Sequence, residues 1–272
     1  MLTETLVKYL AGLLDADGSS TFSFRRQRDQ HEEDLYYLGL TVRLASSTAI
    51  DKLSFVESLP NLTGMGTFSR YGAHKQFKTW AVSKRSDLEM LMPRLLKHMV
   101  VKAKHWQWQF ELLRECRGKL LTPAQCEEMK EASKVSRSTR SGPLKPKNHP
   151  TWAWLAGYLD GDGWYRMKCY TGRDGYPRWN ISVGAVAHAN DLAVLRFLER
   201  TLGGIVRGHG QSPNVFVWYR NLGAEQSSYA LRALPYLAKH SRLKRDKINQ
   251  MIHHHRQQRL SPLTPDEGEA IV

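Results

Sequence analysis

The sequence predicts an α+β protein made of two pseudo-symmetric αββαββα units. The segment YLAGLLDADGSSTFSF at Tyr9–Phe24 recurs as WLAGYLDGDGWYRMKC at Trp154–Cys169, with matching Leu-Ala-Gly and Asp-x-Asp-Gly positions. The chain after each copy runs in parallel through strand-like runs, glycine turns and a late basic segment. Its 272 residues suffice for two domains. We therefore predict a tandem duplication, with repeats at 1–132 and 150–260.

A helix opens each unit and carries the repeated motif on its last turn. Thr3 and Thr151 are the expected N-caps, an apolar run follows each of them, and Asp-Gly ends the run. The sequence therefore places Asp17 and Asp162 at equivalent helix ends.

Two strands joined by a polar turn come next, followed by an amphipathic helix, two further strands and a closing basic helical region. In the first unit these segments are expected at 19–28, 35–45, 49–59, 65–71, 75–82 and 97–113. In the second unit they are expected at 164–170, 179–187, 190–202, 205–209, 215–220 and 239–258. Residues 133–149 contain no acid and form an expected basic linker, and the acidic segment 261–272 is an expected flexible tail.

The composition indicates a folded protein with a polyanionic partner. The formal net charge is +14 and 41% of the residues are hydrophobic, which excludes intrinsic disorder and collagen-like repeats. No window has the roughly 20 apolar residues of a membrane span, and acids interrupt the N-terminal apolar stretch, unlike a signal peptide. Cys116, Cys126 and Cys169 form no CxxC pair. We expect an intracellular protein that has no disulfide framework, zinc module or membrane partner.

Small residues on the two motif helices predict that the helices pack together. Gly12 and Ala16 are four residues apart, as are Gly157 and Gly161, so each helix offers a face that a partner backbone can approach closely. Related helices that pack about a pseudo-twofold axis bring their equivalent ends together. Asp17 and Asp162 are then expected to be neighbours.

Two neighbouring carboxylates repel each other unless a divalent cation lies between them. Oxygen ligands without His or Cys favour Mg²⁺, and a metal beside a basic surface points to phosphodiester hydrolysis. The alternative is that these aspartates, with Asp15 and Asp160, simply end helices before glycine. Two copies with the same preceding Leu-Ala-Gly favour the nuclease interpretation.

The segments LAGLLDADG and LAGYLDGDG resemble the signature of the LAGLIDADG homing endonucleases, specifically the single-chain members with two motifs. The first copy departs from the family name at Leu14, and the second at Tyr158, Leu159 and Gly161. The resemblance covers nearly the whole chain. It implies a saddle of antiparallel sheets that binds DNA, with the two motif helices packed at the interface between the repeats.

The resemblance also implies roles for particular residues. Asp17 and Asp162 would be the metal-binding catalytic acids, assisted by the main-chain carbonyls of Ala16 and Gly161, whereas Asp15 and Asp160 would be structural. A late lysine of each repeat would lie near the scissile phosphates. The expected pair is Lys102 and Lys244, with Lys104 or Lys247 as alternatives. His188 and Ser46 are candidates to order water.

Period-two alternation predicts which strand residues point into the DNA groove. In the first repeat the expected DNA contacts are Thr21, Ser23, Arg25, Gln27, Tyr37, Thr41, Arg43, Thr67, Ser69, Tyr71, Gln76 and Lys78. In the second repeat they are Arg166, Lys168, Tyr170, Arg178, Asn180, Ser182, His188, Arg207, His209 and Gln211. Because the two sets differ, the target site is expected to be asymmetric. His253, His254 and His255 are interpreted as solvent or phosphate contacts, and Trp106, Trp108, Trp152 and Trp154 as packing residues.

The expected function is sequence-specific cleavage of double-stranded DNA by a monomer that uses Mg²⁺. Mn²⁺ is expected to substitute, and Ca²⁺ to support binding without cleavage. The resemblance implies 5′-phosphate and 3′-hydroxyl ends with short 3′ overhangs, and a host element that is a mobile intron. The alternatives are an RNA maturase that assists intron splicing and a non-catalytic DNA-binding regulator.

Overall fold

The fold is that of two similar α+β units joined at a pair of central helices. The computed structural model describes residues 2–27, 34–46, 50–71, 77–138, 151–171, 177–210, 212–222 and 228–260. The first unit contains α1 (Glu4–Asp17), β1 (Gly18–Arg26), β2 (Tyr36–Ser46), α2 (Ile50–Thr63), β3 (Thr67–Tyr71), β4 (Phe77–Val82), α3 (Arg85–Leu96), α4 (Ala103–Glu115) and α5 (Pro123–Ser138). The second contains α6 (Trp152–Gly161), β5 (Gly163–Thr171), β6 (Pro177–His188), a 3-10 turn at Ala189–Asp191, α7 (Leu192–Leu202), β7 (Ile205–His209), β8 (Ser212–Asn221), α8 (Ser228–His240) and α9 (Arg245–Leu260).

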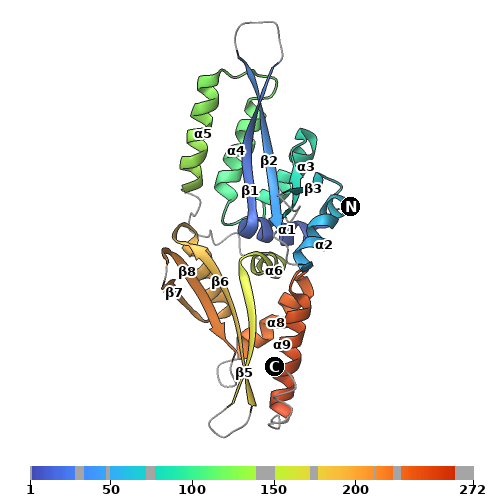
Figure 1. Cartoon of the computed structure of the whole chain (residues 1–272), viewed down its shortest axis with the longest axis vertical. Helices are drawn as coiled ribbons and strands as arrows, with labels where there is room; N and C mark the ends of the chain where they lie inside the picture. Colours follow the sequence, from blue (N-terminus) through green and yellow to red (C-terminus); the bar gives the residue numbers. More distant parts are fainter. Residues whose placement is uncertain are drawn as a thin grey trace.

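The two sheets have the same strand order. Among the described residues, the first runs β1-β2-β4-β3 and the second β5-β6-β8-β7, with antiparallel pairing throughout. The hairpins β1-β2 and β5-β6 point in opposite directions along the long axis, and α1 and α6 lie between the two halves (Figure 1). This arrangement confirms the predicted fold class and the duplication.

Threonine caps start both motif helices, as predicted. The Thr3 side chain accepts a hydrogen bond from the amide of Leu6, and the Thr151 side chain accepts one from the amide of Trp154. Each cap satisfies an amide that has no partner within its own helix. Most of the apolar residues between these caps and the aspartates are buried in the core, and Ala16 and Trp152 are partly buried against it.

Two expectations about the helices are wrong. The closing region of each unit is not one helix: the chain leaves α3 at Leu96 and enters α4 at Ala103, and it leaves α8 at His240 and enters α9 at Arg245. The predicted linker 133–149 begins too early, because α5 continues to Ser138 and Ser133 is buried against α4, where its hydroxyl accepts a hydrogen bond from Gln109. The segment 139–150 and the predicted tail 261–272 lie outside the described residues.

Candidate active site at the paired helix ends

The backbones of α1 and α6 are in direct contact, as the small residues predict. A Cβ atom placed on Gly12 would lie 2.0 Å from the Trp154 carbonyl oxygen, and one on Gly157 would lie 2.0 Å from the Tyr9 carbonyl oxygen. No other residue fits at either position without moving the partner helix, because Cβ atoms do not approach backbone oxygens so closely. The reciprocal contacts define a pseudo-twofold axis between the two repeats.

This packing brings the two motif ends together. A Cβ atom on Gly161 would lie 2.4 Å from the Ala16 Cβ and 3.2 Å from Asp17 Oδ2, so the Asp17 carboxylate lies beside the residue that precedes Asp162. The electrostatic environment of the buried Tyr158 hydroxyl is consistent with the same convergence. The pKa of this hydroxyl is raised well above its ordinary value by burial, and then by the charges of Asp162, Asp191, Asp15 and Asp17.

Lys102 and Lys244 both bind the carboxyl ends of their motif helices. Lys102 is buried, and its Nζ donates to the carbonyl oxygens of Leu14, Ala16 and Gly18 at 3.1, 2.8 and 2.7 Å. Lys244 Nζ donates to the Leu159 oxygen at 2.7 Å and to the Gly163 oxygen. The alternatives from the sequence, Lys104 and Lys247, are exposed. The structure therefore places Lys102 and Lys244 equivalently, each beside its motif aspartate.

The second-motif aspartate lines a cavity that also contains residues of the first repeat. This cavity has a volume of about 250 Å³ and its lining includes Ala16, Lys102, Asp162, His188 and Asp191. The water-ordering candidate His188 is exposed at the end of β6 and is thus in a suitable place, whereas the side chain of Ser46 lies outside the described residues. Sequence reasoning missed Asp191, which follows β6 by a single 3-10 turn and has no motif of its own.

The other two motif acids are buried and bonded to the backbone. Asp15 accepts hydrogen bonds from the amides of Val100 and Lys102 at 2.7 and 2.8 Å. Asp160 accepts from the amides of Arg242 and Leu243 at 2.9 and 3.0 Å. Burial raises the pKa of Asp15, and the two amides act against that shift. These contacts agree with the structural role that the resemblance implies.

Oxygen atoms of the kind that Mg²⁺ prefers surround the helix ends. The two carboxylates of Asp17 and Asp162 and the main-chain carbonyl of Gly161 form such a set. The Ala16 carbonyl already accepts a hydrogen bond from Lys102, so only its second lone pair is available to a cation. Within the described part of the chain, no group of three or more His, Cys, Asp or Glu side chains is suitable for a metal. The residues fit a hard divalent cation that takes its remaining ligands from elsewhere.

The first sheet has one polar face, but two of the expected contacts are placed differently. Leu38, Leu40, Val42 and Leu44 are buried toward the helices, which leaves Arg25, Tyr37 and Arg43 exposed on the opposite face. Thr21 and Ser23 are half-buried on that face, Gln27 follows β1, and Thr67 and Ser69 are exposed on β3. Thr41 shares this face but is only 8% exposed, so it is not the accessible contact that we predicted.

Lys78 lies on the wrong face for a DNA contact. Trp80 is fully buried and Lys78 has the same strand parity, so the lysine points to the helix side. There its Nζ lies 3.2 Å from Glu57 of α2, whose pKa is lowered by Lys78 and by Arg70. The side chain of Tyr71 and the whole of Gln76 lie outside the described residues.

The second sheet follows the predicted alternation more closely. Arg166, Lys168, Tyr170, Asn180, Arg207 and His209 are exposed and Ser182 is half-buried. The inward residues Tyr165, Ile181 and Val183 are buried. The Arg178 side chain and Gln211 lie outside the described residues. Sequence reasoning missed Trp164 and Tyr219, whose rings pack against arginines. The Arg166 Cζ lies 4.7 Å from the ring centre of Trp164, and the Arg207 Cζ lies 4.6 Å from that of Tyr219.

No protein-family model matches the sequence, and no curated protein matches it significantly. Solved structures do match over nearly the full length. The meganuclease I-SmaMI bound to uncleavable DNA superimposes with a TM-score of 0.71 at 15% identity, covering 99% of this chain and 97% of the other. The LAGLIDADG homing endonuclease I-GzeII in complex with its DNA target gives 0.68 at 14% identity, with 100% and 96% coverage. This chain has the LAGLIDADG homing-endonuclease fold.

A third similar structure is I-SmaMI bound to an uncleaved DNA target in the presence of calcium ions, with a TM-score of 0.67, 14% identity and coverage of 97% and 96%. In all three matches a single chain spans both halves of the LAGLIDADG fold, as this chain does. None of the helices in the described part of the chain is long and apolar enough to cross a membrane.

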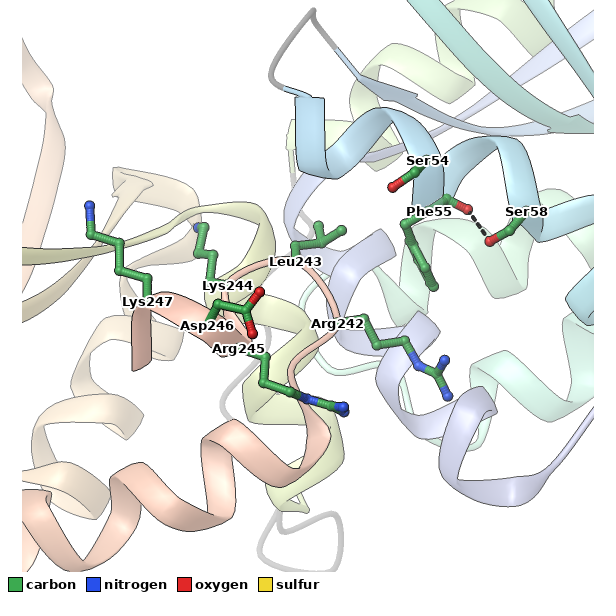
Figure 2. Close-up of a pocket in the computed structure, with 9 residues that line it drawn as sticks. All are labelled: Ser54, Phe55, Ser58, Arg242, Leu243, Lys244, Arg245, Asp246 and Lys247. Carbon is green, nitrogen blue, oxygen red and sulfur yellow. Dashed lines mark hydrogen bonds between the residues drawn. The ribbon is translucent and has the colours of Figure 1, made fainter. Parts of the chain in front are cut away.

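A cavity of about 550 Å³ lies between Ser54, Phe55 and Ser58 of α2 and the segment 242–247 of the second repeat. Figure 2 shows Arg242 extending beneath Phe55, whereas Lys244 extends in the opposite direction. The Arg242 guanidinium lies 5.9 Å from the ring centre of Tyr9 and 6.0 Å from that of Phe55. The loop that carries Lys244 therefore also contacts the first repeat.

Two further interpretations from the sequence have clear outcomes. Trp106 and Trp154 are almost completely buried, Trp108 packs edge-on against Phe22, and Trp152 stacks on Tyr236, which confirms that the tryptophans are packing residues. The expectation for the three consecutive histidines is wrong for His255, which is buried because it shares a helix face with Met251.

Proposed function

We propose that this protein is a site-specific DNA endonuclease that makes a double-strand break by Mg²⁺-dependent phosphodiester hydrolysis. Its partner would be a long, asymmetric duplex bound along the polar faces of both sheets by one copy of the chain. The net charge of +14 supports a polyanionic partner. The host element would be a mobile intron, and the protein would act inside the cell.

One observation carries the proposal: two carboxylates, each beside a lysine, converge where the motif helices meet. The close contact of Gly161 with Ala16 and Asp17 supports that convergence. If the aspartates only ended their helices, Lys102 and Lys244 would not need to bind carbonyl oxygens at those helix ends, as they do. The exposed strand faces then lie on either side of this centre.

The chain's own residues would orient the substrate and stabilise developing charge. Asp17, Asp162 and the nearby carbonyls would hold the cation, which supplies Lewis-acid stabilisation of the phosphate. Phosphate oxygens of the bound strand would complete its coordination, as is usual for Mg²⁺. Water would attack phosphorus and the bond to the 3′ oxygen would break, leaving a 5′-phosphate and a 3′-hydroxyl. Lys102 and Lys244 would offset charge on the phosphate, and His188 would order water.

Cleavage selection with matched acid variants tests the proposal. Wild-type protein is incubated with a plasmid library of random inserts in Mg²⁺, and cut sites are recovered by sequencing. A recovered duplex is then tested with Asp17→Asn and Asp162→Asn. We expect double-strand cleavage to fall by at least 1000-fold in either variant, because each removes a charged cation ligand, while binding in Ca²⁺ persists. We also expect Mn²⁺ to restore cleavage in metal-free wild type.

Two outcomes would contradict the proposal. If the wild type binds DNA but cuts no duplex in Mg²⁺ or Mn²⁺, the protein is a non-catalytic DNA-binding regulator. If it promotes splicing of an intron RNA and both acid variants do so equally well, it is a maturase. Gly208→Ala is the control, because the new Cβ would contact nothing within 4 Å.

A further inference from the structure

Each buried motif acid joins three parts of the molecule. Asp15 of α1 binds the amides of Val100 and Lys102, and it also accepts a hydrogen bond of 3.0 Å from Trp154 Nε1 on α6. Asp160 of α6 accepts hydrogen bonds from the amides of Arg242 and Leu243, in the loop before Lys244. It also accepts a hydrogen bond of 2.7 Å from the Tyr9 hydroxyl on α1. Tyr9 and Trp154 occupy the same position in the two motifs. The contacts are therefore reciprocal across the pseudo-twofold axis.

These bonds reach the loops that carry the two lysines. The first lysine loop, residues 97–102, ends at Lys102, whose own amide donates to Asp15. The second lysine loop, residues 241–244, is bound to Asp160 through the Ser241 hydroxyl at 2.7 Å and the Arg242 and Leu243 amides. The Ser241 hydroxyl in turn accepts from the Lys244 amide at 3.1 Å. Asp15 and Asp160 thus fix the backbone from which each ammonium reaches its motif helix.

The four side chains at the centre of these networks are buried, so water does not readily replace their bonds to one another. Asp15, Asp160, Tyr9 and Trp154 are each at most 2% exposed. A buried carboxylate that loses one donor is left partly unsatisfied, and its remaining partners must move to compensate. A substitution at Trp154 should therefore displace the backbone at Lys102, and a substitution at Tyr9 should displace the backbone at Lys244.

We propose that Tyr9 and Trp154 are positioning residues that act across the repeat interface, each placing the lysine of the opposite repeat through a buried aspartate. The inference rests on the proposed nuclease function for the role of the lysines. It adds that each catalytic centre is complete only when the other repeat is docked. The two centres would then be disturbed separately, one by a change at Trp154 and the other by a change at Tyr9.

Amide hydrogen exchange of the free protein tests the geometry without any DNA. In Tyr9→Phe, which removes a single hydroxyl, we expect the amides of Arg242 and Leu243 to exchange about fivefold faster, as expected for loss of about 1 kcal/mol of hydrogen bonding. The amides of Val100 and Lys102 should be unchanged. Trp154→Phe should give the converse pattern. Equal acceleration at both loops, or none at either, would overturn the proposal.

Strand-specific nicking of the recovered duplex, with both strands end-labelled, tests the consequence. The strand served by each lysine is first identified with Lys102→Met and Lys244→Met. Trp154→Phe should slow nicking of the Lys102 strand at least tenfold more than the other strand, and Tyr9→Phe should do the same to the Lys244 strand. Tyr165→Phe is the matched control, because its buried hydroxyl has no hydrogen-bond partner among the described residues.

The outcomes separate the two proposals. If the wild type cleaves but both variants slow the two strands equally, the positioning proposal is wrong and the nuclease function stands. If the wild type cleaves nothing, the nuclease function is wrong, and the exchange pattern alone decides whether the loops are coupled. Should Trp154→Phe fail to fold, Tyr9→Phe still decides both tests.

Discussion

At the residue scale, strand parity decides which charges are available to a nucleic acid. Arg43 and Lys78 come from adjacent strands of one sheet, yet they lie on opposite faces. The arginine is exposed on the polar face, whereas the lysine is paired with Glu57 on the helix side. Its Nζ also lies 5.8 Å from the Phe68 ring centre. Their contributions to DNA binding should therefore differ although their formal charges are equal.

We predict that Arg43→Ala weakens binding to random duplex DNA and lowers the slope of log K against log salt by about 1, as expected for loss of one phosphate contact. Lys78→Ala should leave that slope unchanged, since the lysine is already neutralised by a carboxylate. A fluorescence anisotropy titration at several salt concentrations measures both slopes. Equal losses in the two variants would show that the face is assigned incorrectly.

Much of the residue assignment could be read from the sequence, since a repeated motif marks equivalent positions without any knowledge of the fold. The duplication identified Asp17, Asp162, Lys102 and Lys244, which the structure brings together in pairs. Parity failed at Lys78 because β4 carries apolar residues at both parities, Phe77 and Ala81 on one and Trp80 and Val82 on the other, and the sequence does not show which pair is buried. Asp191 and the contacts of Tyr9 could not be predicted, because they depend on how the repeats pack.

At the scale of elements, the distance between two helix backbones is set by glycine. Gly12 and Gly157 allow α1 and α6 to touch, and the convergence of Asp17 and Asp162 depends on that contact. The sequence predicted these helices and their packing, because small residues four apart and threonine caps are local signals. It did not predict the breaks before α4 and α9, because the buried acids that fix those loops lie on distant helices.

We predict that Gly12→Ala lowers the free energy of unfolding by about 2–3 kcal/mol, the upper part of the usual range for overpacking in a core. Gly157→Ala should cost a similar amount, because its contact is the mirror of the first. Denaturant unfolding followed by circular dichroism measures the change. The control Gly208→Ala should stay within about 0.5 kcal/mol of the wild type, because its Cβ would meet no atom within 4 Å. A tolerated Gly12→Ala would contradict the backbone contact.

At the scale of the whole molecule, the two polar faces are similar in position but different in chemistry. The first carries Thr, Ser and Arg side chains, whereas the second carries Arg166 over Trp164, Arg207 over Tyr219 and the exposed apolar Ile205. A symmetric duplex would not match both surfaces. The pseudo-twofold axis therefore relates the backbone and the candidate site, while the exposed strand surfaces differ.

The central claim is that the paired helix ends hold a divalent cation against DNA lying on the strand faces. A crystal structure of the protein with a recovered duplex and Mn²⁺, with data collected at the manganese absorption edge, tests it most directly. We expect anomalous peaks within coordination distance of carboxylate oxygens of Asp17 and Asp162 and of phosphate oxygens of the duplex. The duplex should contact Arg43 and Arg166. A duplex on the helix side, or no manganese at either aspartate, would contradict the claim.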